Sequence, residues 1–71
     1  MCMTSEQLLQ LQQLAVSKHL TITFEKTNHE VAYYLVIDTG GFFTVEDAKT
    51  VLYDGPDVDK ALEIFNQYIK S

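Results

Sequence analysis

The chain contains no arginine and no tryptophan, and it has a single proline and a single cysteine among its 71 residues. Because Cys2 stands alone, an intramolecular disulfide is excluded, and a fold of this size has to be stabilised by its core or by a partner. There is no apolar run of about 18 residues, which excludes a typical membrane-spanning helix. The first residues, 1–6, have neither the basic region nor the apolar run of a secretory signal. We therefore expect a cytoplasmic protein.

Negative charge is in clear excess. Ten Asp and Glu residues face five Lys, giving a formal net charge of -5. Cations that could release counterions from a nucleic acid are scarce, so direct binding to DNA or RNA is not expected. A basic protein surface is the complementary partner, while solubility alone remains the other explanation of the charge. The C-terminal half is the more acidic, and the carboxylates predicted to contact a partner are Glu46, Asp47, Asp54, Asp57, Asp59 and Glu63.

Two segments have the apolar spacing of amphipathic helices. Residues 4–18 place leucines and Ala15 on one stripe, which Leu9 and Val16 widen. Thr4 followed by Gln7 fits a capping box at the start of this helix. Residues 57–70 form the second predicted helix, with apolar side chains from Val58 to Ile69 on one side.

Between the helices the apolar period changes from 3.6 to 2, which is typical of strands. Residues 20–25 and 31–38 are predicted to form a hairpin around a two-residue Asn28-His29 loop, which pairs Phe24 with Tyr33. This register places the large apolar side chains on one face. Tyr34 and Val36 fall on the other face, as possible apolar contacts for a partner or as singly exposed strand residues.

Residues 44–54 fit two structures. Thr44 as a helix cap, acidic residues in the first turn, helically spaced apolar residues and a Gly55-Pro56 stop describe a short helix, which we expect here. The alternative is a strand at residues 49–53. The predicted fold is therefore α+β: one domain of residues 1–71 with an N-terminal helix, an antiparallel sheet of two or three strands and two C-terminal helices.

Asp38-Thr39-Gly40-Gly41 has the letters of the catalytic signature of retroviral-type aspartic proteases, in which Asp38 would activate water. The chain has no second apolar pair followed by Gly to brace such a loop, and the same residues are common in turns. We interpret the motif as a turn and expect no catalytic residue.

No cofactor or metal site is expected from the sequence. Cys2, His19 and His29 lack the spacing of metal ligands. The aspartates of residues 54–59 lack the residue order of a calcium-binding loop, and negative charge at the start of a helix explains them.

The helix at 4–18, the strands within 20–38 and the acidic run from Glu46 to Glu63 together resemble small acidic inhibitors encoded by bacteriophages, in particular anti-CRISPR proteins that block Cas9. The resemblance covers the whole chain in element order and charge, without a shared motif. It implies a non-enzymatic protein in the host cytoplasm that occupies the cationic surface of a nucleic-acid-handling host protein. The alternative is an assembly module that forms a homodimer through Tyr34, Val36 and the apolar residues around Phe42.

Overall fold

The computed structural model describes residues 4–70, and the side chains of residues 4–67. The predictions for Cys2, and for the side chains of Tyr68 and Ile69, lie outside the described residues. The helices and strands are α1 (Ser5–Lys18), β1 (Ile22–Asn28), β2 (Val31–Ile37), β3 (Phe43–Asp47), β4 (Val51–Gly55) and α2 (Val58–Lys70).

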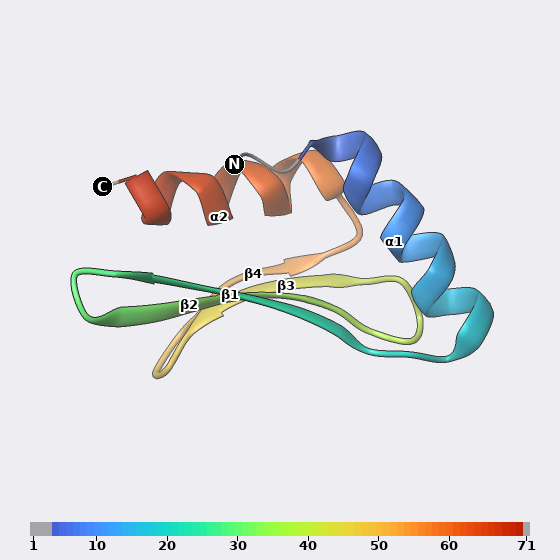
Figure 1. Cartoon of the computed structure of the whole chain (residues 1–71), viewed down its shortest axis with the longest axis horizontal. Helices are drawn as coiled ribbons and strands as arrows, with labels where there is room; N and C mark the ends of the chain where they lie inside the picture. The colour runs from blue at the N-terminus through green and yellow to red at the C-terminus, as the bar shows by residue number, and fades with distance from the viewer. Residues whose placement is uncertain (1–3, 71) are drawn as a thin grey trace.

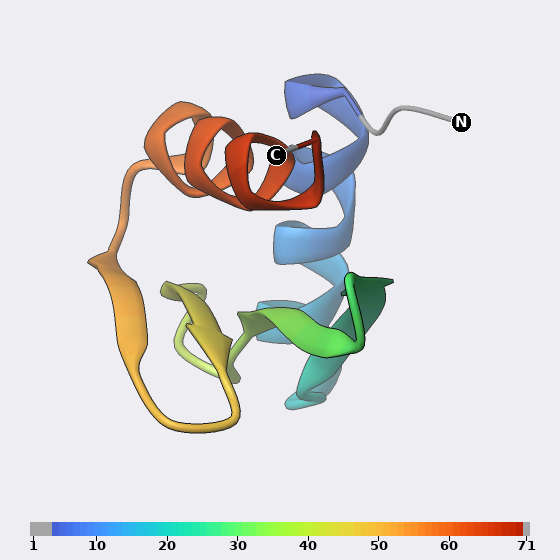
Figure 2. The same ribbon diagram turned by 90° about the vertical axis from the view of Figure 1, so that its left-hand side faces the viewer.

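The strands form one antiparallel sheet in the order β1-β2-β3-β4, and the helices lie on a single side of it (Figure 1). α2 runs along the sheet and contacts all four strands, whereas α1 packs at one end, against α2 and β2. Figure 2, turned by 90°, shows the same two layers, with β4 and β1 at opposite edges of the sheet. The α+β arrangement predicted from the sequence is confirmed. None of the helices in the described part of the chain is long and apolar enough to cross a bilayer.

The start of α1 is the capping box predicted from the sequence. The backbone N–H of Gln7 donates to Thr4 Oγ1 at 3.2 Å, and the N–H of Thr4 donates to Gln7 Oε1 at 2.9 Å. These bonds satisfy N–H groups that have no partner within the helix. α1 ends at Lys18 and is capped by His19, which adopts a left-handed conformation with φ 55°.

The hairpin of β1 and β2 forms, but its predicted register is wrong by two residues. The loop is His29-Glu30, and Phe24 pairs with Leu35 rather than with Tyr33. His29 and Glu30 both have positive φ, at 51° and 67°, as a type I′ turn requires. A shift of two residues keeps every side chain on its face, so the predicted apolar face survives the error.

The predicted helix at residues 44–54 is also wrong, because this segment forms the hairpin of β3 and β4. Asp47 closes its turn: Oδ1 accepts from the N–H groups of Lys49 at 2.8 Å and Thr50 at 2.7 Å. A β-bulge between Val45 and Glu46 interrupts the register. The described residues consequently contain two helices and four strands, not three helices and two or three strands.

The core lies between the sheet and the helices. The centre of the sheet contributes the pairs Leu35–Val45 and Ile37–Phe43, which are fully buried. The helices close over these pairs with Leu8 and Ala15 of α1 and with Ala61, Leu62 and Phe65 of α2. No polar or charged side chain is buried among the described residues, so the core is stabilised by apolar burial alone.

We predict that Leu35→Ala lowers the free energy of unfolding by about 2–5 kcal/mol, because it leaves a cavity in the centre of the core. This is most of the roughly 3–5 kcal/mol that a core of this size supplies. Leu14→Ala on the exposed side of α1 is the matched control, with an expected change within about 0.5 kcal/mol. Urea denaturation followed by circular dichroism measures both, and equal losses would contradict this location of the core.

Candidate protein-binding surface

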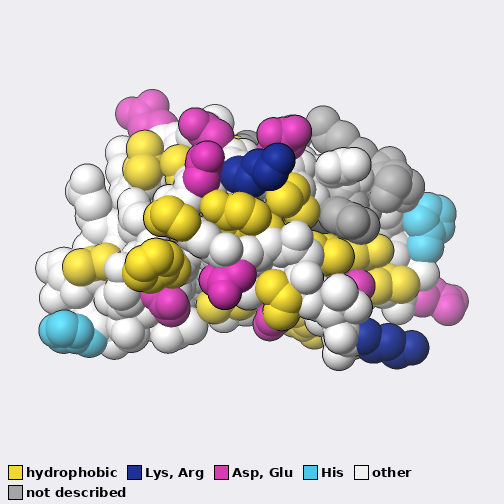
Figure 3. All heavy atoms as spheres, turned by 180° about the vertical axis from the view of Figure 1, so that it is seen from behind, with side chains coloured by type: hydrophobic (Ala, Val, Ile, Leu, Met, Phe, Trp, Pro, Cys, Tyr) yellow, Lys and Arg dark blue, Asp and Glu magenta, His cyan; other side chains and the backbone are white. Residues whose placement is uncertain are grey.

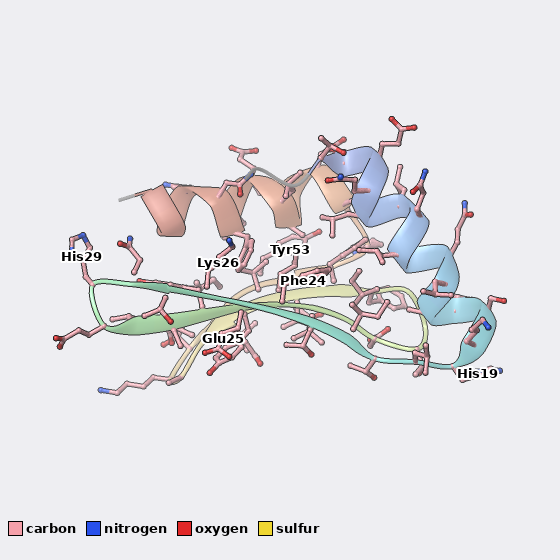
Figure 4. The ribbon with its side chains drawn as sticks, in the orientation of Figure 1. His19, Phe24, Glu25, Lys26, His29 and Tyr53 are labelled. Carbon is pink, nitrogen blue, oxygen red and sulfur yellow. The ribbon has the colours of Figure 1, made fainter. Side chains whose placement is uncertain are left out.

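The surface that the fold leaves uncovered is the side of the sheet opposite the helices. Successive strand residues point to opposite faces, so the residues between the buried positions of β2 and β3 point away from the helices. In Figure 4, Glu25 points away from the helices, whereas Phe24, Lys26 and Tyr53 lie on the helix side. We call this side the bare face.

The strand register arranges the bare face as two cross-strand rows. One row runs Thr23–Val36–Thr44–Asp54, and the other runs Glu25–Tyr34–Glu46–Val51, each from β1 to β4. Tyr34 and Val36 are half-buried, and Val51 is exposed. Tyr34 and Val36 therefore form an apolar pair on β2, and Glu46 on β3 lies between Tyr34 and the apolar Val51 of β4.

Three carboxylates share the bare face: Glu25, Glu46 and Asp54. Glu25 and Glu46 both neighbour Tyr34, one on each adjacent strand, so their backbones are roughly 9–10 Å apart. Lys26 is the only lysine in the four strands, and it points to the helix side (Figure 4). The strands therefore give the bare face negative charge and no cation.

The six carboxylates predicted to contact a partner are divided by the fold. Glu46 and Asp54 lie on the bare face, beside the predicted apolar contacts Tyr34 and Val36. The other four lie at the end of β3, directly before α2 or on α2: Asp47, Asp57, Asp59 and Glu63.

Three of these four carboxylates share a second feature, which is that they already accept hydrogen bonds within the chain. Asp47 holds its turn, as described above. Asp57 caps α2, accepting from the N–H groups of Asp59 at 3.0 Å and Lys60 at 3.2 Å. Asp59 Oδ1 accepts from Ser5 Oγ at 2.6 Å, which joins α2 to α1.

Glu25 is the residue that sequence reasoning missed. Its strand position gave the signal, but it lies outside the acidic C-terminal half.

The carboxylate of Asp38 accepts hydrogen bonds within the turn between β2 and β3. Its Oδ1 accepts from the N–H groups of Gly40 at 2.8 Å and Phe42 at 3.0 Å, and its carbonyl accepts from the N–H of Gly41. Gly41 has φ +87°, and a Cβ there would come within 3.0 Å of Val16 Cγ2. The Asp-Thr-Gly-Gly sequence therefore forms a turn whose carboxylate organises its own loop.

His19 and His29 lie at opposite ends of the molecule (Figure 4). Among the residues that the structure describes, no three His, Cys, Asp or Glu side chains are grouped to hold a metal ion. Comparison of the chain with protein-family models, with curated proteins and with solved structures found no match.

For Asp38, we predict that Asp38→Ala destabilises the protein by about 1 kcal/mol, since two backbone N–H groups lose their acceptor. Asp38→Asn retains a side-chain oxygen that can accept these bonds, so its free energy of unfolding should fall by less than half as much as that of Asp38→Ala. Urea denaturation of both variants tests this. Equal stability of Asp38→Ala and the wild type would show that the carboxylate is not needed for the turn.

Proposed function

We propose that this chain is a non-enzymatic binding protein whose bare face binds the basic surface of a nucleic-acid-handling protein and so prevents that surface from binding nucleic acid. The observation that carries the proposal is that Glu25, Glu46 and Asp54 lie among Tyr34, Val36 and Val51 on a sheet face that neither helix covers.

The composition of the bare face resembles that of protein interfaces. These commonly have an apolar centre and a polar rim, and tyrosine is enriched among the residues that contribute most to affinity. Tyr34 has this central position, because it lies between Glu25 and Glu46 in its row. A partner that offers Lys or Arg around an apolar patch would pair with the carboxylates while Tyr34 and Val36 are buried.

A protein surface that binds nucleic acid is positively charged, which is complementary to the carboxylates of the bare face. Lysines and arginines in such a site are positioned for phosphates, and carboxylates on a rigid sheet can take the places of these phosphates. Binding of this kind associates quickly and weakens as salt is added, because the screening length is about 10 Å at 0.1 M salt. This is the mode of action implied by the resemblance to phage-encoded anti-CRISPR inhibitors. A CRISPR effector in the cytoplasm of a bacterial host is thus a specific candidate for the target.

Homodimerisation through the same face is the competing function, and the charges disfavour it. Two copies joined through Tyr34 and Val36 would bring the carboxylates of both bare faces together, and each chain carries a net charge of -5. Like charges placed opposite each other across an interface are unfavourable. The bare face is therefore better suited to a basic partner than to itself.

We predict that Glu25→Lys/Glu46→Lys loses at least about tenfold of the wild-type affinity for basic partners, because two attractive contacts become repulsive. The control is Glu30→Lys/Glu63→Lys, which reaches the same net charge at exposed positions in the β1–β2 turn and on α2. The immobilised proteins are exposed to bacterial lysate at about 50 mM and about 500 mM salt. Retained proteins are identified by mass spectrometry, purified and tested for DNA binding with and without this chain.

The expected result is retention of identified nucleic-acid-binding proteins by the wild type and the control, but not by the bare-face variant, with loss at high salt. The purified target should bind labelled DNA less tightly when the chain is added. Equal loss in both double variants would mean that only net charge matters. Retention that is indifferent to salt, or a target that still binds its DNA normally, would also contradict the proposal.

A further inference from the structure

β1 lies at the edge of the sheet and pairs with a strand on one side only. In the strand order β1-β2-β3-β4 its neighbour is β2, and all seven residues of β1 pair with β2 without a shift of register. In the part of the chain that the structure describes, no strand lies beyond it. We call the side of β1 that faces away from β2 the β1 edge.

The hydrogen-bond pattern of the hairpin decides which backbone groups face the β1 edge. Residues that flank a two-residue loop form a hydrogen-bonded pair, and such pairs recur at every second residue of an antiparallel ladder. Asn28 and Val31 flank the loop of residues 29–30. Every second residue of β1, counted back from Asn28, therefore directs its N–H and C=O groups to β2. The residues between them direct theirs to the β1 edge: Thr23, Glu25 and Thr27.

Backbone groups with this spacing are complementary to an extended strand. Each of these three residues offers one donor and one acceptor. Thr23 and Thr27 are about 14 Å apart along the strand, so a segment of about five residues covers them. A strand that adds to a sheet edge gains affinity from its main-chain bonds and specificity from its alternate side chains.

The two charged side chains of β1 point to opposite sides of the sheet. Glu25 points to the bare face, whereas Phe24 and Lys26 lie on the helix side (Figure 4). Both charged side chains are exposed. Opposite charges on directly paired strand residues stabilise a sheet, and like charges destabilise it. A strand that pairs with β1 should therefore have Lys or Arg opposite Glu25, Asp or Glu opposite Lys26 and an apolar residue opposite Phe24.

A second copy of this chain does not meet these requirements. Two β1 edges related by a twofold axis run antiparallel. Pairing centred on Glu25 places two glutamates opposite each other, and pairing centred on Lys26 places two lysines opposite each other. Pairing centred on Phe24 sets Glu25 opposite Thr23 and Lys26 opposite Ile22, so neither charge gains a partner. The charges of β1 thus disfavour its own copy.

The other edge of the sheet, at β4, is shorter and less regular. β4 has five residues, and its pairing with β3 shifts register between Val45 and Glu46. Such bulges twist an edge strand and deter further pairing. Figure 3, the view from behind, shows the β4 side of the molecule, where hydrophobic and acidic side chains are intermixed. Of the two edges, β1 is the better acceptor of a strand.

We propose that the β1 edge binds an extended segment of the basic partner protein, which pairs antiparallel to β1. Read along this segment, an acidic residue opposite Lys26 is followed by Lys or Arg opposite Glu25 and by an apolar residue opposite Phe24. The antiparallel direction is that of every pair in this sheet and is the more stable per residue. The inference deepens the proposed function and rests on it for the class of partner, because Glu25 belongs to both the bare face and β1.

The test uses two short peptides with capped ends, titrated into the isotope-labelled protein and followed by NMR of the backbone amides. The matched peptide, Thr-Glu-Lys-Val-Thr-Val, places opposite charges against Glu25 and Lys26. The swapped peptide, Thr-Lys-Glu-Val-Thr-Val, has the same composition but places like charges there. We expect the matched peptide to shift the amide signals of Thr23, Glu25 and Thr27 and to slow their hydrogen exchange, with the swapped peptide binding at least about fivefold more weakly.

Methylated versions of the matched peptide test the backbone pairing. Its lysine forms the hydrogen-bonded pair with Glu25, so a methyl group on the lysine backbone nitrogen removes a bond to β1. The backbone nitrogen of the next residue, valine, points away from β1. We expect lysine methylation to weaken binding at least about tenfold and valine methylation to leave it near that of the parent peptide. Equal effects of the two methyl groups would overturn the proposal.

A charge exchange in the protein tests the side-chain pairing. Glu25→Lys/Lys26→Glu keeps the net charge of the chain and should prefer the swapped peptide to the matched one. The matched control is Lys60→Glu/Glu63→Lys, which exchanges two exposed charges on α2 and should keep the preference of the wild type. Circular dichroism checks that both variants are folded. An unchanged preference in the β1 variant would contradict the proposed pairing.

Two further outcomes would overturn the proposal. One is equal binding of the matched and swapped peptides to the wild type. The other is slow exchange of the Thr23, Glu25 and Thr27 amides in the protein alone together with a dimer in light scattering, since a second copy would then be the partner. The proposed function fails separately, because the peptides carry no net charge and their binding does not depend on retention of basic proteins from lysate.

Discussion

The pairing of β2 with β3 under the helices is the constraint on which the rest of the structure depends. It places Leu35 beside Val45 and Ile37 beside Phe43, and all four side chains are fully buried. Because strand side chains alternate, burying these residues necessarily turns Tyr34, Val36, Thr44 and Glu46 to the opposite side. The hydrophobic core and the bare face are thus two consequences of one register, and neither can be shifted without the other.

The sequence predicted the parts of the fold that are encoded locally. The capping box at Thr4 and the start of α2 near Asp57 depend on side chains within one helical turn. The local sequence was therefore sufficient to predict both helix starts. The hairpin register was missed because its type I′ turn uses His29 and Glu30, where Asn-Gly or Asp-Gly would be expected. In residues 44–54 the bulge near Val45 allows the adjacent Leu52 and Tyr53 both to pack against the core. Apolar residues consequently fall at helical spacing in a segment that forms strands.

The candidate surface could be predicted only in part, since it is made by pairing between strands. Tyr34, Val36, Glu46 and Asp54 were identified from the alternation and the charge. Strand alternation also placed Glu25 on the face of Tyr34, but it was not selected because it lies outside the acidic C-terminal half. Conversely, Asp57 and Asp59 contribute to the charge of the C-terminal half while serving to start α2 and to bind Ser5. A high local density of acidic residues in sequence therefore did not correspond to one surface in space.

The most direct test of this account is to measure which side chains of the sheet are accessible to solvent. A soluble gadolinium chelate added to the protein broadens the NMR signals of exposed methyl and aromatic groups. The register predicts strong broadening for Tyr34, Val36 and Val51 and little for Leu35, Ile37 and Val45. Protection of Tyr34 and Val36 in a protein shown to be monomeric would mean that something covers the bare face, and it would contradict the account.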